Sequence, residues 1–201
     1  IDEDDLLVTA VKELQAVSSL PLQLDSVKAS AMEKAMRIYN GKPLINSVNG
    51  KKESMDSVLP LVKKYGGTVI ALTIDEEGIP ETAEGRCAIA ERIINECAKY
   101  GIDRKDVIVD PLAMTVSSDN QSGRITLASV GMIKERLGVK TSLGVSNISF
   151  GLPSRDTVNS HFLTMALTEG LDCAIMNPYS IAMMESYHSF RALKGLDENC
   201  S

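Results

Sequence analysis

The chain has 201 residues, of which 44% are hydrophobic and 24% are charged, and its formal net charge is -6. This balance predicts one globular domain over residues 1–201, with enough apolar side chains for a sizeable core. A negative charge without any basic run argues against a nucleic-acid-binding protein. The apolar runs are far shorter than the ~20 residues of a membrane-spanning helix.

The N-terminus, Ile1-Asp2-Glu3-Asp4-Asp5, is acidic where a secretory signal would be basic, so we expect no targeting peptide. No CxxC pair and no zinc-type Cys/His spacing occurs, and His161 and His188 fall in helical patterns, so we expect no metal site. We expect reduced thiols in a cytoplasmic protein. The cysteines are Cys87, Cys97, Cys173 and Cys200.

In chain order, apolar runs typical of strands alternate with amphipathic segments typical of helices. Up to residue 100 we expect a helix at 5–17, a strand at 21–26, a helix at 27–39, a strand at 42–50, a helix at 53–65, a strand at 68–74 and a helix at 82–100. From there we expect a strand at 107–111, a polar loop at 115–123, a helix at 125–137, a strand at 141–149, a helix at 158–169, a strand at 173–178 and a helix at 181–193.

Strand–helix alternation with short loops predicts parallel βαβ units. We count six strands, whereas a (β/α)8 barrel has eight, and the chain begins with a helix that no strand precedes. The expected fold is therefore an α/β TIM barrel whose first two βα units are missing from this sequence. An open doubly wound sheet is the second choice, because no G-x-G-x-x-G or G-x-x-x-x-G-K-[ST] follows any strand.

Polar residues stand at four of the strand ends: Asp25, Asn46, Asp110 and Asn147. In a parallel barrel the C-terminal ends of the strands share one face, so these side chains are expected to converge on one pocket. Each also has a structural explanation, since the two acids could cap the segments that follow and Asn46 could shape a turn.

Two carboxylates and two amides suit a heterocycle rich in N–H groups, such as the 2-amino-4-oxo pyrimidine of a pterin. A carboxylate can accept two parallel N–H bonds from that ring. An asparagine can hold a ring nitrogen in either protonation state, because it offers both a donor and an acceptor.

The segments G-K-P-L-I-N-S-V-N-G, V-D-P-L and T-S-L-G-V-S-N-I-S-F-G-L-P-S-R, with G-L-D-C-A-I-M-N-P near the C-terminus, resemble the pterin-binding domain of folate-dependent corrinoid methyltransferases. The resemblance runs from about Leu22 to the last helix. It implies a dihydropteroate-synthase-like barrel, methyltetrahydrofolate or tetrahydrofolate as substrate, cobalamin carried by a corrinoid partner protein, and a homodimer.

By position, the resemblance implies that Asp25, Asn46 and Asp110 bind the pterin ring and that Asn147 lies near N5, the methyl-bearing nitrogen. Arg155 matches an arginine of the pocket rim, where it would meet the folate tail or brace the loop. Phe150 departs from relatives with a polar amide at this position.

The implied reaction moves a methyl group between N5 and cobalt, and N5 must gain a proton or a strong hydrogen bond as the C–N bond breaks. No His, Lys or Glu stands at a strand end, so we expect Asn147 to stabilise the developing N5–H, with the proton arriving through water and the Asp110 region. Loop 115–123 would be a lid or docking surface, or a solvated loop without a role.

Three alternatives remain. Dihydropteroate synthase shares the barrel and the pterin pocket, but Asn177-Pro178 stands where an Arg-x-His would end the last strand. A non-catalytic pterin-binding or corrinoid-docking module of a larger methyltransferase fits the same residues. A barrel enzyme with an unrelated substrate would make the strand-end residues a coincidence.

Overall fold

The structure is a computed structural model that describes residues 2–198. The chain divides into two compact units. The first contains the residues up to 79 together with 88–109, and the second contains 80–87 and the residues from 110 onward. Helix α4 (Ala83–Lys99) and strand β4 (Val107–Asp110) contribute residues to both. Residues 2–198 hold six strands whose order in the sheet follows the chain, which confirms the expected strand count.

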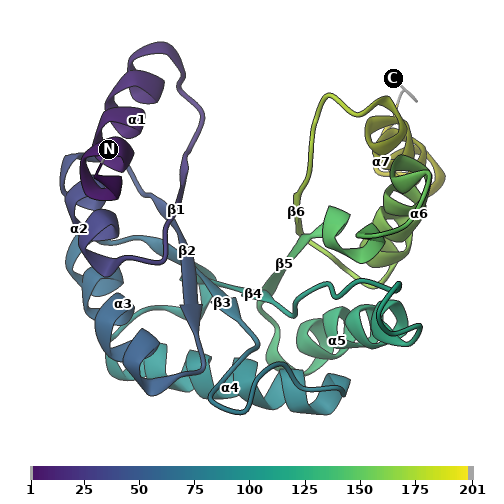
Figure 1. Ribbon diagram of the computed structural model, residues 1–201, viewed down its shortest axis with the longest axis horizontal. Helices are drawn as coiled ribbons and strands as arrows, with labels where there is room; N and C mark the ends of the chain where they lie inside the picture. The colour runs from purple at the N-terminus through teal and green to yellow at the C-terminus, as the bar shows by residue number, and fades with distance from the viewer. Residues whose placement is uncertain (1, 199–201) are drawn as a thin grey trace. The chain divides into compact units, whose positions relative to one another are not determined.

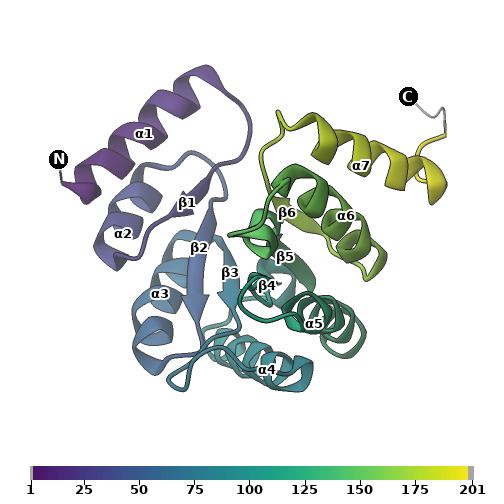
Figure 2. The ribbon, with the colours of Figure 1, turned by 45° about the vertical axis from the view of Figure 1, so that its right-hand side comes forward.

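The first unit repeats a helix–strand pattern. Helix α1 (Glu3–Val17) packs beside α2 (Ala29–Ile38), as Figures 1 and 2 both show. Strand β1 (Gln23–Asp25) pairs in parallel with β2 (Leu44–Asn49), which pairs in parallel with β3 (Thr68–Leu72). Asp25 is the last residue of β1, whereas Asn46, predicted at a strand end, lies inside β2, which continues to Asn49. The two residues are nevertheless adjacent, because they are register partners on neighbouring strands.

The core of the first unit explains why these segments form strands and helices. Ile45, Val69 and Ile70 are fully buried, because apolar strands of a parallel sheet are covered by crossover helices. Helix α3 (Lys52–Tyr65) packs on β2 and supplies the buried Leu59. It ends at Gly66, whose φ of 75° is the left-handed conformation that closes helices.

The second unit contains α5 (Ser122–Leu137), β5 (Lys140–Gly144), the 3-10 helix η2 (Val145–Ser149), α6 (Arg155–Thr168), β6 (Cys173–Ile175) and α7 (Ile181–Leu193). Strands β5 and β6 are parallel, with Leu143 opposite Ala174. Helices α6 and α7 pack together (Figures 1 and 2). Leu143, Val145, Ile148 and Leu163 form the centre of the apolar core.

Four predicted boundaries differ from the structure by three residues or more. The strand expected at 141–149 ends at Gly144, and η2 takes the remaining residues, because Val145 and Ile148 both point into the core at the three-residue spacing of a 3-10 helix. The helix expected from 158 begins at Arg155, the one expected from 125 begins at Ser122, and the last strand stops at Ile175. The last helix has the predicted bounds.

Candidate functional site

In the first unit, Asp25 and Asn46 form a hydrogen-bonded pair on adjacent strands. They are register partners, and the Nδ2 of Asn46 donates to Oδ2 of Asp25 at 3.1 Å. Asp25 is exposed and Asn46 is half-buried. The N-cap position of α2 is Lys28, so Asp25 does not cap that helix. The pair leaves carboxylate and amide oxygens available as acceptors for N–H donors.

Asn49, three residues after Asn46, has the turn-shaping role that sequence reasoning considered for Asn46. Its Oδ1 accepts a hydrogen bond from the backbone N–H of Lys51 at 2.9 Å, and its own N–H donates to Ser54 Oγ at 3.1 Å. These bonds shape the turn from β2 into α3. Asn46 therefore differs from Asn49, because its amide is directed at Asp25 and not at the turn.

In the second unit, Asp110 is a buried carboxyl at the end of β4, only 6% exposed. Its Oδ1 accepts a hydrogen bond from the N–H of Leu112 at 2.8 Å, so the turn-capping role considered from the sequence is present. Burial raises the pKa of Asp110 to about 6, although the N–H of Leu112, the charge of Arg86 and the N–H of Gly144 each lower it. A carboxyl with such a pKa changes charge near neutral pH.

Asn147 lies in η2, just beyond the end of β5, with an exposed side chain. Its amide folds back over the backbone of Gly144: a Cβ atom on Gly144 would lie 2.9 Å from the Nδ2 of Asn147. Within the described part of the chain, the side chain of Asn147 has no hydrogen-bond partner. It is thus free to donate to or accept from a ligand.

Arg155 is the first residue of α6 and braces η2. Its Nε donates to Ser149 Oγ at 3.0 Å and its Nη2 donates to the carbonyl of Ser146 at 2.9 Å. Its guanidinium lies over the ring of Phe150, 4.5 Å from the centroid. The sequence left two roles open for Arg155, contact with the folate tail and bracing of the loop. These contacts favour the bracing role.

The loop before α5 is attached to the same segment. The hydroxyls of Thr115 and Ser117 both donate to the carbonyl of Phe150, at 2.6 and 2.7 Å, and the N–H of Val116 donates to the carbonyl of Ile148. The predicted polar loop is therefore tied to η2 along its first half. Its last two residues already belong to α5.

Sequence reasoning missed Arg86, a buried residue of α4 that is 3% exposed. Its Nη1 donates to the carbonyls of Pro111 and Leu112, at 2.9 and 2.8 Å, and to Thr126 Oγ1 at 3.3 Å. Its Nε donates to the carbonyl of Pro80 at 3.0 Å. The helical spacing from the buried residues Ala83, Ala90 and Ile93 puts Arg86 on the apolar face of the helix. This spacing is the sequence signal from which the burial of Arg86 could have been predicted.

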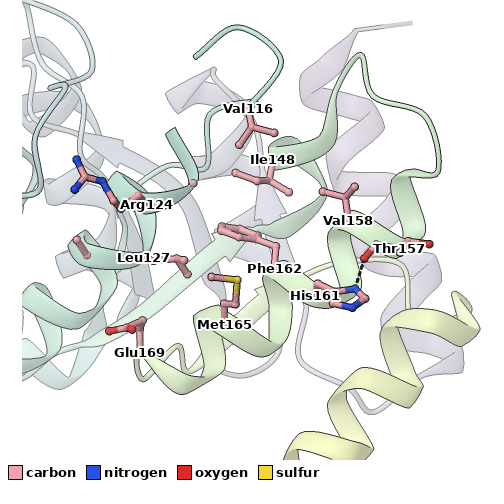
Figure 3. A pocket seen from close by; sticks show the side chains of 12 residues that line it. Val116, Arg124, Leu127, Ile148, Thr157, Val158, His161, Phe162, Met165 and Glu169 are labelled. Atoms are coloured by element: carbon pink, nitrogen blue, oxygen red, sulfur yellow. Dashed lines mark hydrogen bonds between the residues drawn. The ribbon is translucent and has the colours of Figure 1, made fainter. Parts of the chain in front are cut away.

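A cavity of about 830 Å³ lies between α5 and α6 (Figure 3). Leu127, Phe162 and Met165 point into it, and His161 at its edge is hydrogen-bonded through Nδ1 to the carbonyl of Thr157 in its own helix, at 2.8 Å. None of the five predicted site residues lines it. Despite its size, this cavity is lined mainly by apolar side chains.

Further observations bear on the other sequence predictions. In α4, Cys87 and Cys97 are buried, and burial raises the pKa of the Cys97 thiol to about 12. Cys173 lies in β6, half-buried, whereas Cys200 lies outside the described residues. No helix in residues 2–198 is both long enough and apolar enough to cross a membrane.

Comparison with known proteins identifies relatives across most of the chain. A family model described as "Pterin binding enzyme" matches residues 2–177. The chain is 32% identical over 190 residues to the methylcorrinoid:tetrahydrofolate methyltransferase of Eubacterium limosum, covering 93% of this chain and 70% of that protein. It is 36% identical over 184 residues to the methionine synthase of Mycobacterium tuberculosis, covering 85% of this chain but only 15% of that protein.

Solved structures with the same fold include dihydropteroate synthases. The enzyme from Yersinia pestis superimposes with a TM-score of 0.77 at 17% identity, covering 96% of this chain and 76% of that one. The enzyme from Vibrio fischeri gives a TM-score of 0.74 at 17% identity, covering 95% and 74%. At this identity the similarity establishes the fold, which is the dihydropteroate-synthase-like α/β barrel type expected from the sequence.

Proposed function

Because this chain belongs to the family of pterin-binding enzymes, we propose that it transfers a methyl group between N5 of methyltetrahydrofolate and the cobalt of a corrinoid. The observation that carries the proposal is the identity of 32–36%, over 84–93% of the chain, to relatives named as corrinoid–folate methyltransferase and methionine synthases. The corrinoid would be carried by a partner protein or a further domain. A homodimer in the cytoplasm is part of the same proposal.

The proposal assigns the pterin ring to Asp25, Asn46 and Asp110. An ionised carboxylate accepts the parallel N–H bonds of the 2-amino pyrimidine, and charge-assisted bonds of this kind are roughly twice as strong as neutral ones. The exposed Asp25, oriented by Asn46, and the buried Asp110 both supply such carboxylates. These residues would supply the affinity for the pterin and fix the orientation of its ring. They would do so equally before and after the methyl transfer.

Asn147 is assigned to N5. During transfer to cobalt, the C–N bond breaks, its electron pair stays on N5, and N5 takes a proton from water. The amide of Asn147, which has no partner within residues 2–198, would stabilise N5 as it changes from a methylated to a protonated nitrogen. A group that acts on developing charge raises the rate of transfer more than the affinity. Arg155 would hold η2, and with it Asn147, in place.

Dihydropteroate synthase activity is a weaker candidate. The solved neighbours with that activity are 16–17% identical, so they support the fold alone. The segment Asn177-Pro178 that follows β6 also lacks a basic group for a pyrophosphate leaving group. A non-catalytic module that binds pterin and docks a corrinoid protein fits the same residues and differs only in lacking turnover.

The test combines binding and turnover. Isothermal titration calorimetry with methyltetrahydrofolate, beside Asp110→Ala, should give micromolar-range binding that is lost in the variant, while Glu135→Gln on an exposed part of α5 should bind normally. Methyl transfer to added cob(I)alamin then separates an enzyme from a docking module. A folded wild-type protein that binds no folate would refute the proposal, and formation of dihydropteroate from p-aminobenzoate would replace it.

A further inference from the structure

Arg86 is a buried cation that is bound mainly by backbone carbonyls. Four of its hydrogen bonds go to Pro80, Pro111, Leu112 and Thr126, at 2.8 to 3.3 Å. Burial lowers its pKa, and the charge of Asp110 opposes that effect. A buried charge is costly unless it is fully hydrogen-bonded. The presence of an arginine at this buried position of α4 therefore needs a reason beyond packing.

The backbone that Arg86 holds is the segment that directly follows Asp110. Leu112 has a φ of 66°, in the left-handed region that a leucine rarely adopts. Its N–H donates to Asp110, while its carbonyl accepts from both Arg86 and Thr126, the latter at 3.1 Å. The peptide groups on both sides of Leu112 are thus fixed by hydrogen bonds, and Arg86 donates to a carbonyl of each. Strained backbone of this kind persists only where its surroundings determine it.

We propose that Arg86 is a positioning residue for pterin recognition: it holds the Pro111–Leu112 backbone so that Asp110 is fixed in one orientation and presented to the pterin as a carboxylate. This inference rests on the proposed pterin-binding function. Arg86 itself does not touch the substrate. It acts through the carbonyls of two adjacent residues and through its charge.

The charge contribution has a definite sign. The groups that act on Asp110 are Arg86 from α4, the N–H of Leu112 from its own loop and the N–H of Gly144 from β5. Removal of a positive charge near a carboxyl disfavours the ionised form and raises its pKa. Because only the carboxylate accepts both N–H bonds of the ring, loss of Arg86 should move the low-pH limit of binding upward.

The experiment measures the dissociation constant of methyltetrahydrofolate from pH 5 to 8 by calorimetry. Arg86→Met should weaken binding at pH 7.5 by about tenfold, which corresponds to about 1.4 kcal/mol, and should raise the midpoint of the pH dependence. Arg86→Lys keeps the charge but loses the planar fork, so it should keep the midpoint and recover only part of the affinity. Arg124→Met, on an exposed part of α5, is the matched control and should behave as wild type.

A second variant and a ligand-free measurement keep the test decisive. Thr126→Val removes one Arg86 acceptor and one donor to the Leu112 carbonyl, and should weaken binding severalfold even if Arg86→Met does not fold. Carboxyl ¹³C NMR follows Asp110 without folate, and its midpoint should rise in Arg86→Met. Wild-type protein that binds no folate would refute the proposed function. Wild-type binding combined with unchanged affinity and midpoints in the Arg86 and Thr126 variants would overturn the role of Arg86 alone.

Discussion

The amide of Asn46 donates to the carboxylate of Asp25 at 3.1 Å across a pair of parallel strands on which the two residues are register partners. The contact orients a carboxylate that would otherwise rotate freely, because Asp25 is exposed. It also occupies one of the two oxygens and leaves the other for a ligand.

Asn46→Ala should weaken folate binding by at least about tenfold, since a hydrogen bond to a charged group contributes about 1.5–3 kcal/mol. Asp25→Ala should weaken it further, because it removes the charge itself. Stability should change little, as the pair is not buried in the core. Calorimetry and thermal denaturation of both single variants and the double variant measure the two effects. Strictly additive losses would show that the pair does not act as a unit.

The contribution of Asp110 to the stability of the protein should decrease as the pH rises from about 4 to above 6. The pKa of Asp110, raised to about 6 by burial, exceeds its ordinary value of 3.8, so the folded state favours the protonated form. The stabilising contribution of Asp110 is fully present below its ordinary pKa and is lost as the pH rises through its pKa in the folded state. The total loss of stability is at most about 3 kcal/mol.

Urea unfolding between pH 4 and 7.5 measures this dependence. Asp110→Asn should remove it, and Glu135→Gln, at an exposed position of α5, should retain it. Folate binding should follow the opposite trend and strengthen as Asp110 ionises. Identical slopes for wild type and Asp110→Asn would show that another group is responsible for the titration.

Gly144→Ala should slow methyl transfer without unfolding the protein. The new methyl group would meet the Nδ2 of Asn147 at 2.9 Å, and a terminal side-chain amide can move aside. Asn147→Ala should lower kcat by more than it weakens folate binding, and adding Gly144→Ala to it should cause no further loss. Single-turnover kinetics of the three variants tests this. Equal effects on rate and affinity would exclude a special role for Asn147 at N5.

Arg155→Ala should lower the melting temperature, because it removes hydrogen bonds to Ser149 and Ser146 and the contact with Phe150. Each such bond contributes about 1 kcal/mol. Arg155→Lys should recover little, since an ammonium cannot span both acceptors with a rigid fork. Thermal denaturation measures the loss. If Arg155 also meets the folate tail, the variants will lose affinity for methyltetrahydrofolate but not for a pterin without the tail.

The sequence was sufficient for features that depend on local pattern. The β-branched run Thr68–Leu72 and the glycine that closes α3 are such features, and both lie where they were expected. A change from apolar to polar correctly marked the strand ends at Asp25 and Asp110. It was wrong for Asn46, which lies inside β2, and for Asn147, which lies in η2. The assignment of Asp25, Asn46, Asp110 and Asn147 to a pterin remains a prediction that the arrangement of side chains does not test.

Features that depend on tertiary contacts were missed. Arg86 carries a charge, and a charged residue in a helix pattern is usually read as solvent-facing, although its spacing placed it on the buried side. The end of β5 was placed too late, because Val145 continues the apolar run even though it belongs to η2. Leu112 gave no indication of its left-handed backbone, since that conformation is imposed by the two partners that hold its peptide groups.

The close approach of Gly144 and Asn147 also restricts how this segment can diverge. A side chain at position 144 displaces the amide at 147 from its present orientation, so the amide keeps this orientation only while position 144 is glycine. Among distant relatives we therefore expect glycine at the first position wherever asparagine occupies the second, and free variation at the first where it does not. Such a pattern of joint occurrence would mark which members of the family keep the amide in this orientation.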